Sequence, residues 1–302
     1  MTNPEPTIRI PVDLTNPGQF FACCGLLELA DRLWGGAEGW FSNDGSMFHL
    51  RGAHAEGCSI AGIIERVARA GLVGELTPAL QQQREAFETE KRQLKKEKKN
   101  LPVSKEARRK ELGLLLREGT ISIGEPFNLR LNWWQEDGDD IPKTWAGRQE
   151  VLRIARAMQA ALSRPETQTE TLFDLGLVVF DPLEPDKKVE PFYFDSRRGA
   201  NAQSIDIGFA PDSLEMTTAA YPAVEFLCLV GLQRCRPMPT GKARVFHYYS
   251  WAIPYHPVVL PAVVCGLLKT PGSQGYRFEN AFRTDQRKYK AFLPATLLGD
   301  LQ

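Results

Sequence analysis

The sequence of 302 residues has no apolar run of roughly 18 residues, the length that indicates a membrane-spanning helix. Its first six residues, Met-Thr-Asn-Pro-Glu-Pro, lack the basic and then apolar segments of a secretory signal. We therefore expect a cytoplasmic protein without a membrane partner. Hydrophobic residues make up 43% of the chain, which is enough for a sizeable core and argues against global disorder.

Cysteine is sparse, and none of the six cysteines lies in a Cys-x-x-Cys pair. Cys23 and Cys24 are adjacent, and most of the six lie within apolar runs. This distribution favours buried thiols in a reducing compartment over a disulfide or zinc framework.

The sequence also lacks the common catalytic motifs. It has no Gly-x-Ser-x-Gly elbow, no phosphate-binding Gly-x-x-x-x-Gly-Lys-Ser/Thr loop and no His-Glu-x-x-His pair. Only four histidines are present; His49, His54 and Cys58 are close enough to suggest a metal site, but no fourth ligand is evident. Surface or core histidines are the simpler interpretation. We therefore predict a protein that is not an enzyme and that has no metal or other cofactor.

Net charge is also absent, because 37 basic residues balance 37 acidic ones. A neutral total argues against a protein that coats DNA through its overall charge. The charges are nevertheless unevenly distributed. From Arg84 to Lys110, eleven basic and five acidic residues give a stretch of 27 residues a net charge of +6.

Residues 79–118, which contain this basic stretch, differ in kind from the rest of the chain. They are rich in strong helix formers, and residues 100–103 interrupt the helical pattern. Ser104 is a candidate cap for a second helix. A thin apolar seam recurs every seven residues and consists of Leu80, Phe87 and Leu94. We predict a basic helical hairpin that projects from the body.

This hairpin carries the strongest candidate site, a surface for nucleic-acid phosphates. Residues three and four apart share a helix face, so we expect Lys91, Lys95, Lys98 and Lys99 to converge on one side. The full set of candidate contacts is Lys91, Arg92, Lys95, Lys96, Lys98, Lys99, Arg108, Arg109 and Lys110. The alternative is a solvated helix pair laced with Glu–Lys pairs.

Two smaller basic patches are further candidates. The loop after Asp195 contains Arg197, Arg198, Asn201 and Gln203, which are residue types that read base edges; a surface turn is equally compatible. Near the C-terminus, the basic residues Arg283, Arg287, Lys288 and Lys290 are interleaved with the aromatic residues Phe282, Tyr289 and Phe292. That pattern fits single-strand binding by stacking, and it equally fits core aromatics covered by cations.

The body on either side of the hairpin reads as one mixed structure. Residues 1–78 form an N-terminal α/β unit, in which Asn16 caps a helix that begins at Pro17. Residues 119–302 form a mixed α+β remainder of the same body, with late strands expected at 245–251 and 258–265. Strands and helices interleave without a strict βαβ rhythm, so we expect an α+β fold.

Three runs of sequence resemble a known family. They are Asn16-Pro17-Gly18-Gln19 with Gly25-Leu26-Leu27-Glu28; Phe194-Asp195-Ser196-Arg197-Arg198-Gly199-Ala200 with Asp206-Ile207-Gly208-Phe209; and Tyr221 to Pro237, which includes Gly231-Leu232-Gln233-Arg234. Together they resemble a subunit family of the type I-G (formerly I-U) CRISPR effector complexes, which are also called Cascade. The family is that of the large-subunit-like component.

The resemblance implies a non-catalytic subunit of a crRNA-guided surveillance complex. Its implied partners are the backbone and crRNA-processing subunits, crRNA, target double-stranded DNA and a helicase–nuclease effector. On this interpretation the chain recognises a motif flanking the target and holds displaced DNA, with Arg197, Arg198 and Asn201 as candidate motif contacts. Two alternatives stay open: a subunit that binds crRNA or caps the backbone, and a metal-dependent nuclease that uses Asp206, Asp212 and Glu215.

Overall fold

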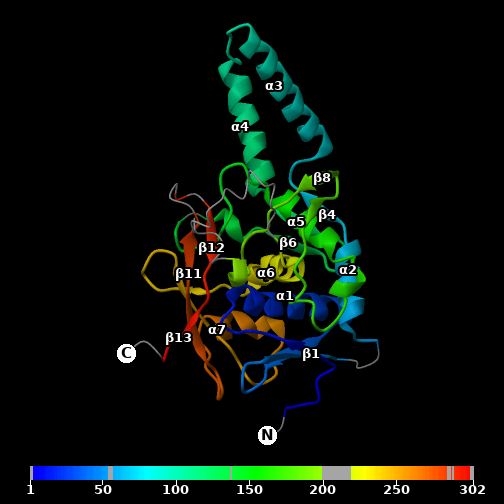
Figure 1. Ribbon diagram of the computed structural model, residues 1–302, viewed down its shortest axis with the longest axis vertical. Helices are drawn as coiled ribbons and strands as arrows, with labels where there is room; N and C mark the ends of the chain where they lie inside the picture. Colours follow the sequence, from blue (N-terminus) through cyan, green and yellow to red (C-terminus); the bar gives the residue numbers. More distant parts are fainter. Residues whose placement is uncertain are drawn as a thin grey trace, which may run out of the picture.

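The computed structural model describes residues 3–53, 57–136, 138–198, 219–283, 287 and 289–299. It shows a mixed α+β body from which one long helical hairpin projects, at the end opposite the N-terminus (Figure 1). None of the helices in these ranges is long and apolar enough to cross a membrane.

The N-terminal part begins with strand β1 (Ile8–Pro11), helix α1 (Pro17–Trp34) and strands β2 (Ala37–Phe41) and β3 (Met47–Gly52). The three strands form an antiparallel sheet in the order β1-β3-β2. The Asn16 side chain accepts hydrogen bonds from the backbone N–H groups of Gly18 and Gln19, which confirms the predicted cap. Helix α2 (Ile60–Arg69) and strand β4 (Leu72–Gly74) follow.

The hairpin leaves and re-enters the body through paired strands. Helices α3 (Pro78–Lys96) and α4 (Val103–Glu118) are inserted between β4 and β5 (Ile121–Ile123), and these two strands pair with each other. Strand β6 (Leu129–Leu131) completes this small sheet. The sheet therefore fixes the root of the hairpin.

The rest of the chain completes the body. Helix α5 (Val151–Ala161), the strand pair β7 (Phe180–Asp181) and β8 (Glu184–Lys188), and helix α6 (Pro222–Arg234) come first. A second sheet then contains β9 (Met238–Pro239), β10 (Val245–Tyr249), β11 (Gly275–Phe282) and β12 (Lys290–Phe292), with β13 (Thr296–Leu297) pairing β11. Short 3-10 turns at 133–135, 165–167, 196–198 and 257–259 link these elements.

Two expected elements differ in the structure. The strand predicted at 258–265 is wrong: a 3-10 turn leads into helix α7 (Leu260–Val264), because Pro257 and Pro261 each stand in a first helical turn. Ser104 does not cap the second helix of the hairpin, since α4 begins one residue earlier, at Val103.

Helices α1 and α6 run side by side in the same direction through the centre of the body (Figure 1). They touch at Gly25 and Gly231: a Cβ atom on Gly25 would lie 2.0 Å from the carbonyl oxygen of Leu227, and one on Gly231 would lie 2.0 Å from that of Phe21. Only glycine fits at either place. The same pairing sets Glu28 against Arg234, one turn later.

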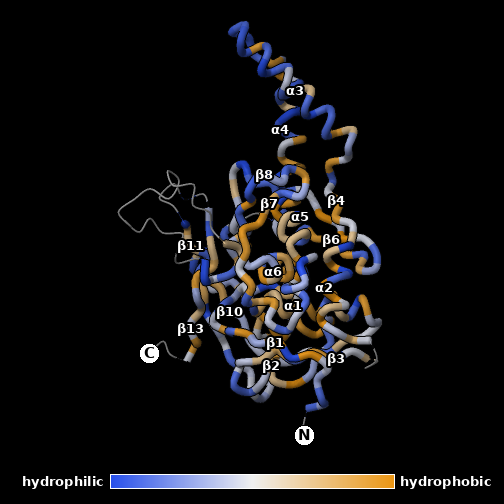
Figure 2. The backbone as a smooth tube through the Cα atoms, turned by 45° about the vertical axis from the view of Figure 1, so that its right-hand side comes forward, coloured by the Kyte–Doolittle hydropathy of each residue, from blue (hydrophilic) through white to orange (hydrophobic). Residues whose placement is uncertain are grey.

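The hairpin has little core of its own. No residue of α3 is buried, and in α4 only Leu112 and Gly113 are buried. Figure 2 shows a largely hydrophilic hairpin, whereas hydrophobic segments gather in the body.

Cys23, Cys24, Cys228 and Cys235 are buried thiols, and no disulfide bond is formed between described residues.

Candidate nucleic-acid interface

The two hairpin helices are joined by a ladder of ion pairs. Glu106 accepts hydrogen bonds from Lys91 of the opposite helix (2.9 Å) and from Arg109 (2.8 Å). Arg109 also reaches Glu88, and Lys105 reaches Glu90 at 2.7 Å. Hydrogen bonds from Arg109 and Lys91 lower the pKa of Glu106 to about 2, so its carboxylate stays ionised.

This ladder divides the predicted phosphate contacts into two groups. Lys91 and Arg109 are paired across the hairpin and belong to the ladder, whereas Arg108 pairs with Glu111 on its own helix. The remaining candidates are all exposed: Arg92, Lys95, Lys96, Lys98, Lys99 and Lys110. Within the described part of the chain, Lys99 alone of these six has an ion-pair partner, Glu97.

Five of the exposed cations gather at the tip, which we define as Arg92, Lys95, Lys96, Lys98 and Lys99. The expected face of Lys91, Lys95, Lys98 and Lys99 is wrong, because α3 ends at Lys96 and Lys91 turns toward α4. The cations surround the turn between the helices instead. Glu97 is the one carboxylate between Arg92 and Lys99.

The backbone at the tip adds to this positive surface. Lys98 has a φ of 58°, the left-handed conformation that favours glycine, and its neighbour Lys99 donates its N–H to the carbonyl of Leu94. Helix α4 then begins after Pro102, and no side chain caps it. Its first N–H groups therefore point toward the tip, where an anion can accept from them.

The smaller patch around Arg197 is tied into the body. Arg197 donates to the buried carboxylate of Asp195 (2.7 Å) and to the carbonyl of Phe173, and its guanidinium lies over the Tyr221 ring, 3.5 Å from the centroid. Its donors are therefore used inside the chain. Arg198 is half-buried, and its Nε atom has no hydrogen-bond partner in the described part. Asn201 and Gln203 lie outside the described residues, as do Asp206, Asp212, Glu215 and His54.

Asp195 belongs to a buried polar joint that holds the starts of α1 and α6 together. Asn16 donates to Asp195 (3.0 Å) and accepts from the N–H of Ser196 (3.1 Å). The Glu225 carboxyl accepts from the N–H groups of Phe194 and Asp195. Burial raises the pKa of Glu225 to about 8, with a further contribution from the charge of Asp195. Asn16, Asp195 and Glu225, one from each of the three runs that carry the family resemblance, thus meet in the core.

In the C-terminal patch, Arg283 is packed against the body. Arg283 is 13% exposed; its guanidinium lies over the Tyr193 ring, 3.4 Å from the centroid, and near Glu190 at 3.5 Å. This arrangement follows the alternative of cations covering core aromatics. Arg287 is exposed, whereas Lys288 lies outside the described residues. The structure brings neither arginine to the tip.

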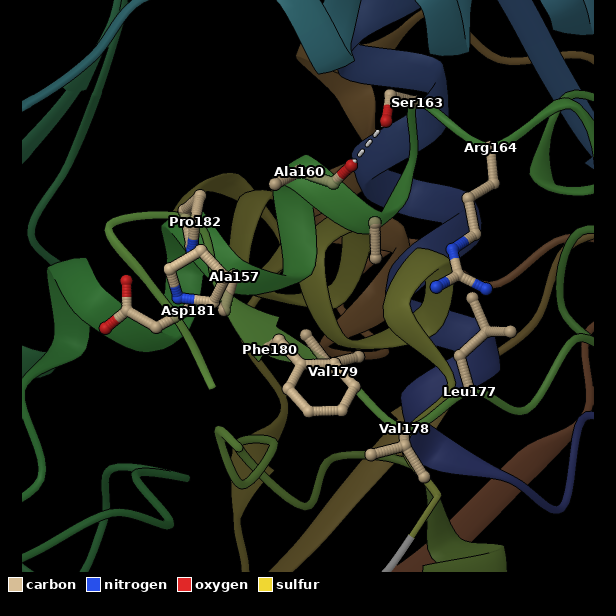
Figure 3. Close-up of a pocket in the computed structure, with 12 residues that line it drawn as sticks. Ala157, Ala160, Ser163, Arg164, Leu177, Val178, Val179, Phe180, Asp181 and Pro182 are labelled. Atoms are coloured by element: carbon tan, nitrogen blue, oxygen red, sulfur yellow. Dashed lines mark hydrogen bonds between the residues drawn. The ribbon is translucent and has the colours of Figure 1, made fainter. Parts of the chain in front are cut away.

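The body also has a small cavity of about 230 Å³ between α5 and residues 177–185, lined by both apolar and polar groups. Its floor is built from alanines of α5, and Figure 3 shows Arg164 and Asp181 on opposite sides of the lining. Arg153 pairs with Asp181, and Ser163 donates to the carbonyl of Ala160. The Asp181 carboxylate and the Ser163 hydroxyl thus have partners within the chain, and the polar groups of the lining do not converge on one point in the cavity. Within the described ranges, no cluster of three or more His, Cys, Asp or Glu residues has metal-binding geometry.

Sequence reasoning found the basic hairpin but not the division of its charges. Glu90 and Glu106 neutralise lysines that are fifteen residues away in the sequence. The signal was present as alternating charges on both helices, but it becomes specific only when the register between them is known. No family model matches the chain, and no curated protein or solved structure matches it either.

Proposed function

We propose that this chain is a non-catalytic, nucleic-acid-binding subunit of a type I-G CRISPR surveillance complex. It binds target DNA beside the guide, takes part in recognition of the flanking motif, holds the displaced strand and helps to recruit the helicase–nuclease. The observation that carries the nucleic-acid part of the proposal is the cluster of five cations at the tip of the hairpin. The assignment to this complex rests on the sequence resemblance.

The geometry of the tip suits contact with phosphates. The tip cations stand on a projecting element and take no part in the ladder, so they are available to a partner without breaking its ion pairs. Lysine and arginine that neutralise phosphates release counterions, which gives affinity that is independent of base sequence and falls with salt. In such a complex the guide reads sequence by base pairing, and the protein binds the backbone and a short flanking motif.

The test compares two charge reversals in the reconstituted crRNA complex. The tip variant carries Lys95→Glu, Lys96→Glu and Lys98→Glu, and the control carries Lys187→Glu, Lys242→Glu and Lys269→Glu on the body. Both variants change the net charge equally, and all six lysines are exposed. The affinity for target duplex is measured against salt, with correct and incorrect flanking sequence.

We expect the tip variant to lose at least tenfold in affinity and its salt slope to fall by about two to three, while stability changes by roughly 0.5 kcal/mol or less. The control should bind as the wild type does. An unchanged salt slope in the tip variant would remove the tip from the interface. If omission of the whole chain releases the guide RNA or collapses the complex, the chain is an RNA-holding subunit and the DNA proposal is wrong.

A further inference from the structure

A second basic site lies on the body, away from the tip. Arg32 of α1, Arg130 of β6 and Arg234 of α6 line a cavity of about 420 Å³, together with Glu28, Leu129 and Gln233. These residues come from three elements that are far apart in the sequence. The side chain of Arg130 is 68% exposed, whereas those of Arg32 and Arg234 are about one-third exposed.

Two of the arginines are held in place by one buried carboxylate. Glu28 accepts hydrogen bonds from Nε of Arg32 (2.7 Å) and from Nη2 of Arg234 (3.1 Å), and also from Nε of Arg234. Burial raises the pKa of Glu28, but the hydrogen bonds from both arginines outweigh burial and the net shift is downward, so the carboxylate stays ionised. Arg32 is fixed further by donation from Nη1 to the carbonyl of Phe127 (3.0 Å). Both guanidinium groups are thereby pre-oriented.

The hydrogen bonds to Glu28 leave some N–H donors of these two arginines unused. In the described part of the chain, Nη2 of Arg32 and Nη1 of Arg234 have no hydrogen-bond partner. Three guanidinium groups share the cavity with one buried carboxylate, so the site keeps an excess of positive charge. A planar guanidinium offers paired N–H groups that match the oxygens of a phosphate, and pre-orientation lowers the cost of ordering them.

The cavity lies at the root of the hairpin. Arg130 donates to the hydroxyl of Thr120 (3.4 Å) and lies 3.7 Å from Glu75. Glu75 stands just before α3, and Thr120 stands just after α4. The pair with Glu75 is long and exposed, so a phosphate can replace it at little cost. With 16 residues, α4 separates the root from the tip by about 24 Å, the length of roughly seven base pairs.

We propose that Arg32, Arg130 and Arg234, oriented by Glu28, form a phosphate-binding site at the root of the hairpin. Resting on the proposed function, this phosphate is one of the nucleic-acid backbone, about seven base pairs from those held at the tip. The tip and the root site then contact phosphates at two places along the same duplex. A free phosphate or a nucleotide would present the same chemistry to the site.

The test uses the full chain, two labelled duplexes and inorganic phosphate. The duplexes have about 6 and about 16 base pairs, so the longer one alone can reach from tip to root. The first variant is Arg130→Gln, which leaves the hydrogen bonds to Glu28 intact. The second is Arg234→Lys, which keeps the charge but removes the paired N–H groups of the guanidinium. Arg69→Gln is the matched control, because Arg69 is also exposed and pairs with one glutamate, Glu65.

We expect both variants to weaken binding of the longer duplex roughly three- to tenfold, with a smaller effect on the shorter duplex. Arg130→Gln should also lower the salt slope by about one, whereas Arg234→Lys keeps its charge and should leave the slope unchanged. Arg69→Gln should bind as the wild type does. If the tip variant loses binding while Arg130→Gln and Arg234→Lys do not, the root site is wrong and the proposed function stands.

Inorganic phosphate separates the remaining outcomes. Suppose that the wild type binds neither duplex but is thermally stabilised by phosphate over chloride at equal ionic strength, and that Arg130→Gln abolishes this effect. The proposed function then fails, while the root site stands as a site for a free phosphate or nucleotide. If neither duplex binds and phosphate gives no stabilisation, both proposals are wrong.

Discussion

The protein contains two pairs of packed helices that are held together in opposite ways. In the body, α1 and α6 meet at Gly25 and Gly231, with backbone against backbone and a buried polar joint at their starts. In the hairpin, α3 and α4 meet through a ladder of exposed or half-buried ion pairs. The first pair depends on shape, and the second depends on charge.

The difference determines what each pair tolerates. A buried contact without free space transmits any change of volume to the fold, because the interior is close-packed. An exposed ion pair contributes little individually and is easily replaced by water. We therefore expect the body to fix the structure, while the hairpin can carry a functional surface that changes without loss of the fold. Three predictions test this contrast.

The largest effect is expected at the glycine contact. Gly25→Ala should destabilise the protein by about 3 kcal/mol or more, because the added methyl group meets a backbone oxygen that has no space to move. Gly113→Ala in α4 is the matched control, since its Cβ would meet only the Arg117 side chain, at 3.6 Å. This control should stabilise the protein by about 0.5–1 kcal/mol. Urea unfolding measures both; equal effects of the two variants would contradict the contrast.

An intermediate effect is expected at the helix caps. Asn16→Ala should cost about 2–4 kcal/mol, because it removes a cap and leaves the buried Asp195 carboxylate and the Ser196 N–H without their partner. Thr77 caps α3 in the same way but is exposed, so Thr77→Ala should cost about 1 kcal/mol or less. Thermal unfolding compares the two. A cost for Thr77→Ala as large as that for Asn16→Ala would mean that burial of the joint is unimportant.

The smallest effect is expected at the tip. Lys98→Gly should stabilise the hairpin by about 0.5–1 kcal/mol, because glycine adopts the left-handed conformation of this residue without strain. The same change removes one tip cation, so the salt slope of nucleic-acid binding should fall by about one. Hydrogen exchange of the α3 and α4 amides reports the local stability. Faster exchange in the variant would show that lysine is the better residue there.

Elements with strong local signals could be predicted from the sequence. Asn16 before Pro17 specified the start of α1, and the charged helical pattern of 79–118 specified the hairpin. The apolar run at 258–265 was misassigned, because its valines favour a strand while Pro257 and Pro261 fit first helical turns. There, proline geometry and packing outweighed β-propensity.

The candidate site was less predictable because its chemistry depends on pairing between distant residues. Lys91 and Arg92 are neighbours in sequence, yet Lys91 belongs to the ladder and Arg92 belongs to the tip. The root site depends on residues near 28, 130 and 234, and no local pattern links these three positions. Both sites depend on how segments that are distant in the sequence align in the tertiary structure. Composition and periodicity do not reveal that alignment.

The length of the hairpin has a consequence for how the neutral chain presents its charge. Mobile ions screen a charge within a Debye length of about 8 Å at physiological ionic strength, and the hairpin extends about three times that distance. The charges of the acidic residues of the body are therefore largely screened at the tip. An approaching polyanion therefore interacts with the local positive charge of the tip, while the charges of the rest of the chain are screened. This holds although the whole chain has a formal net charge of zero.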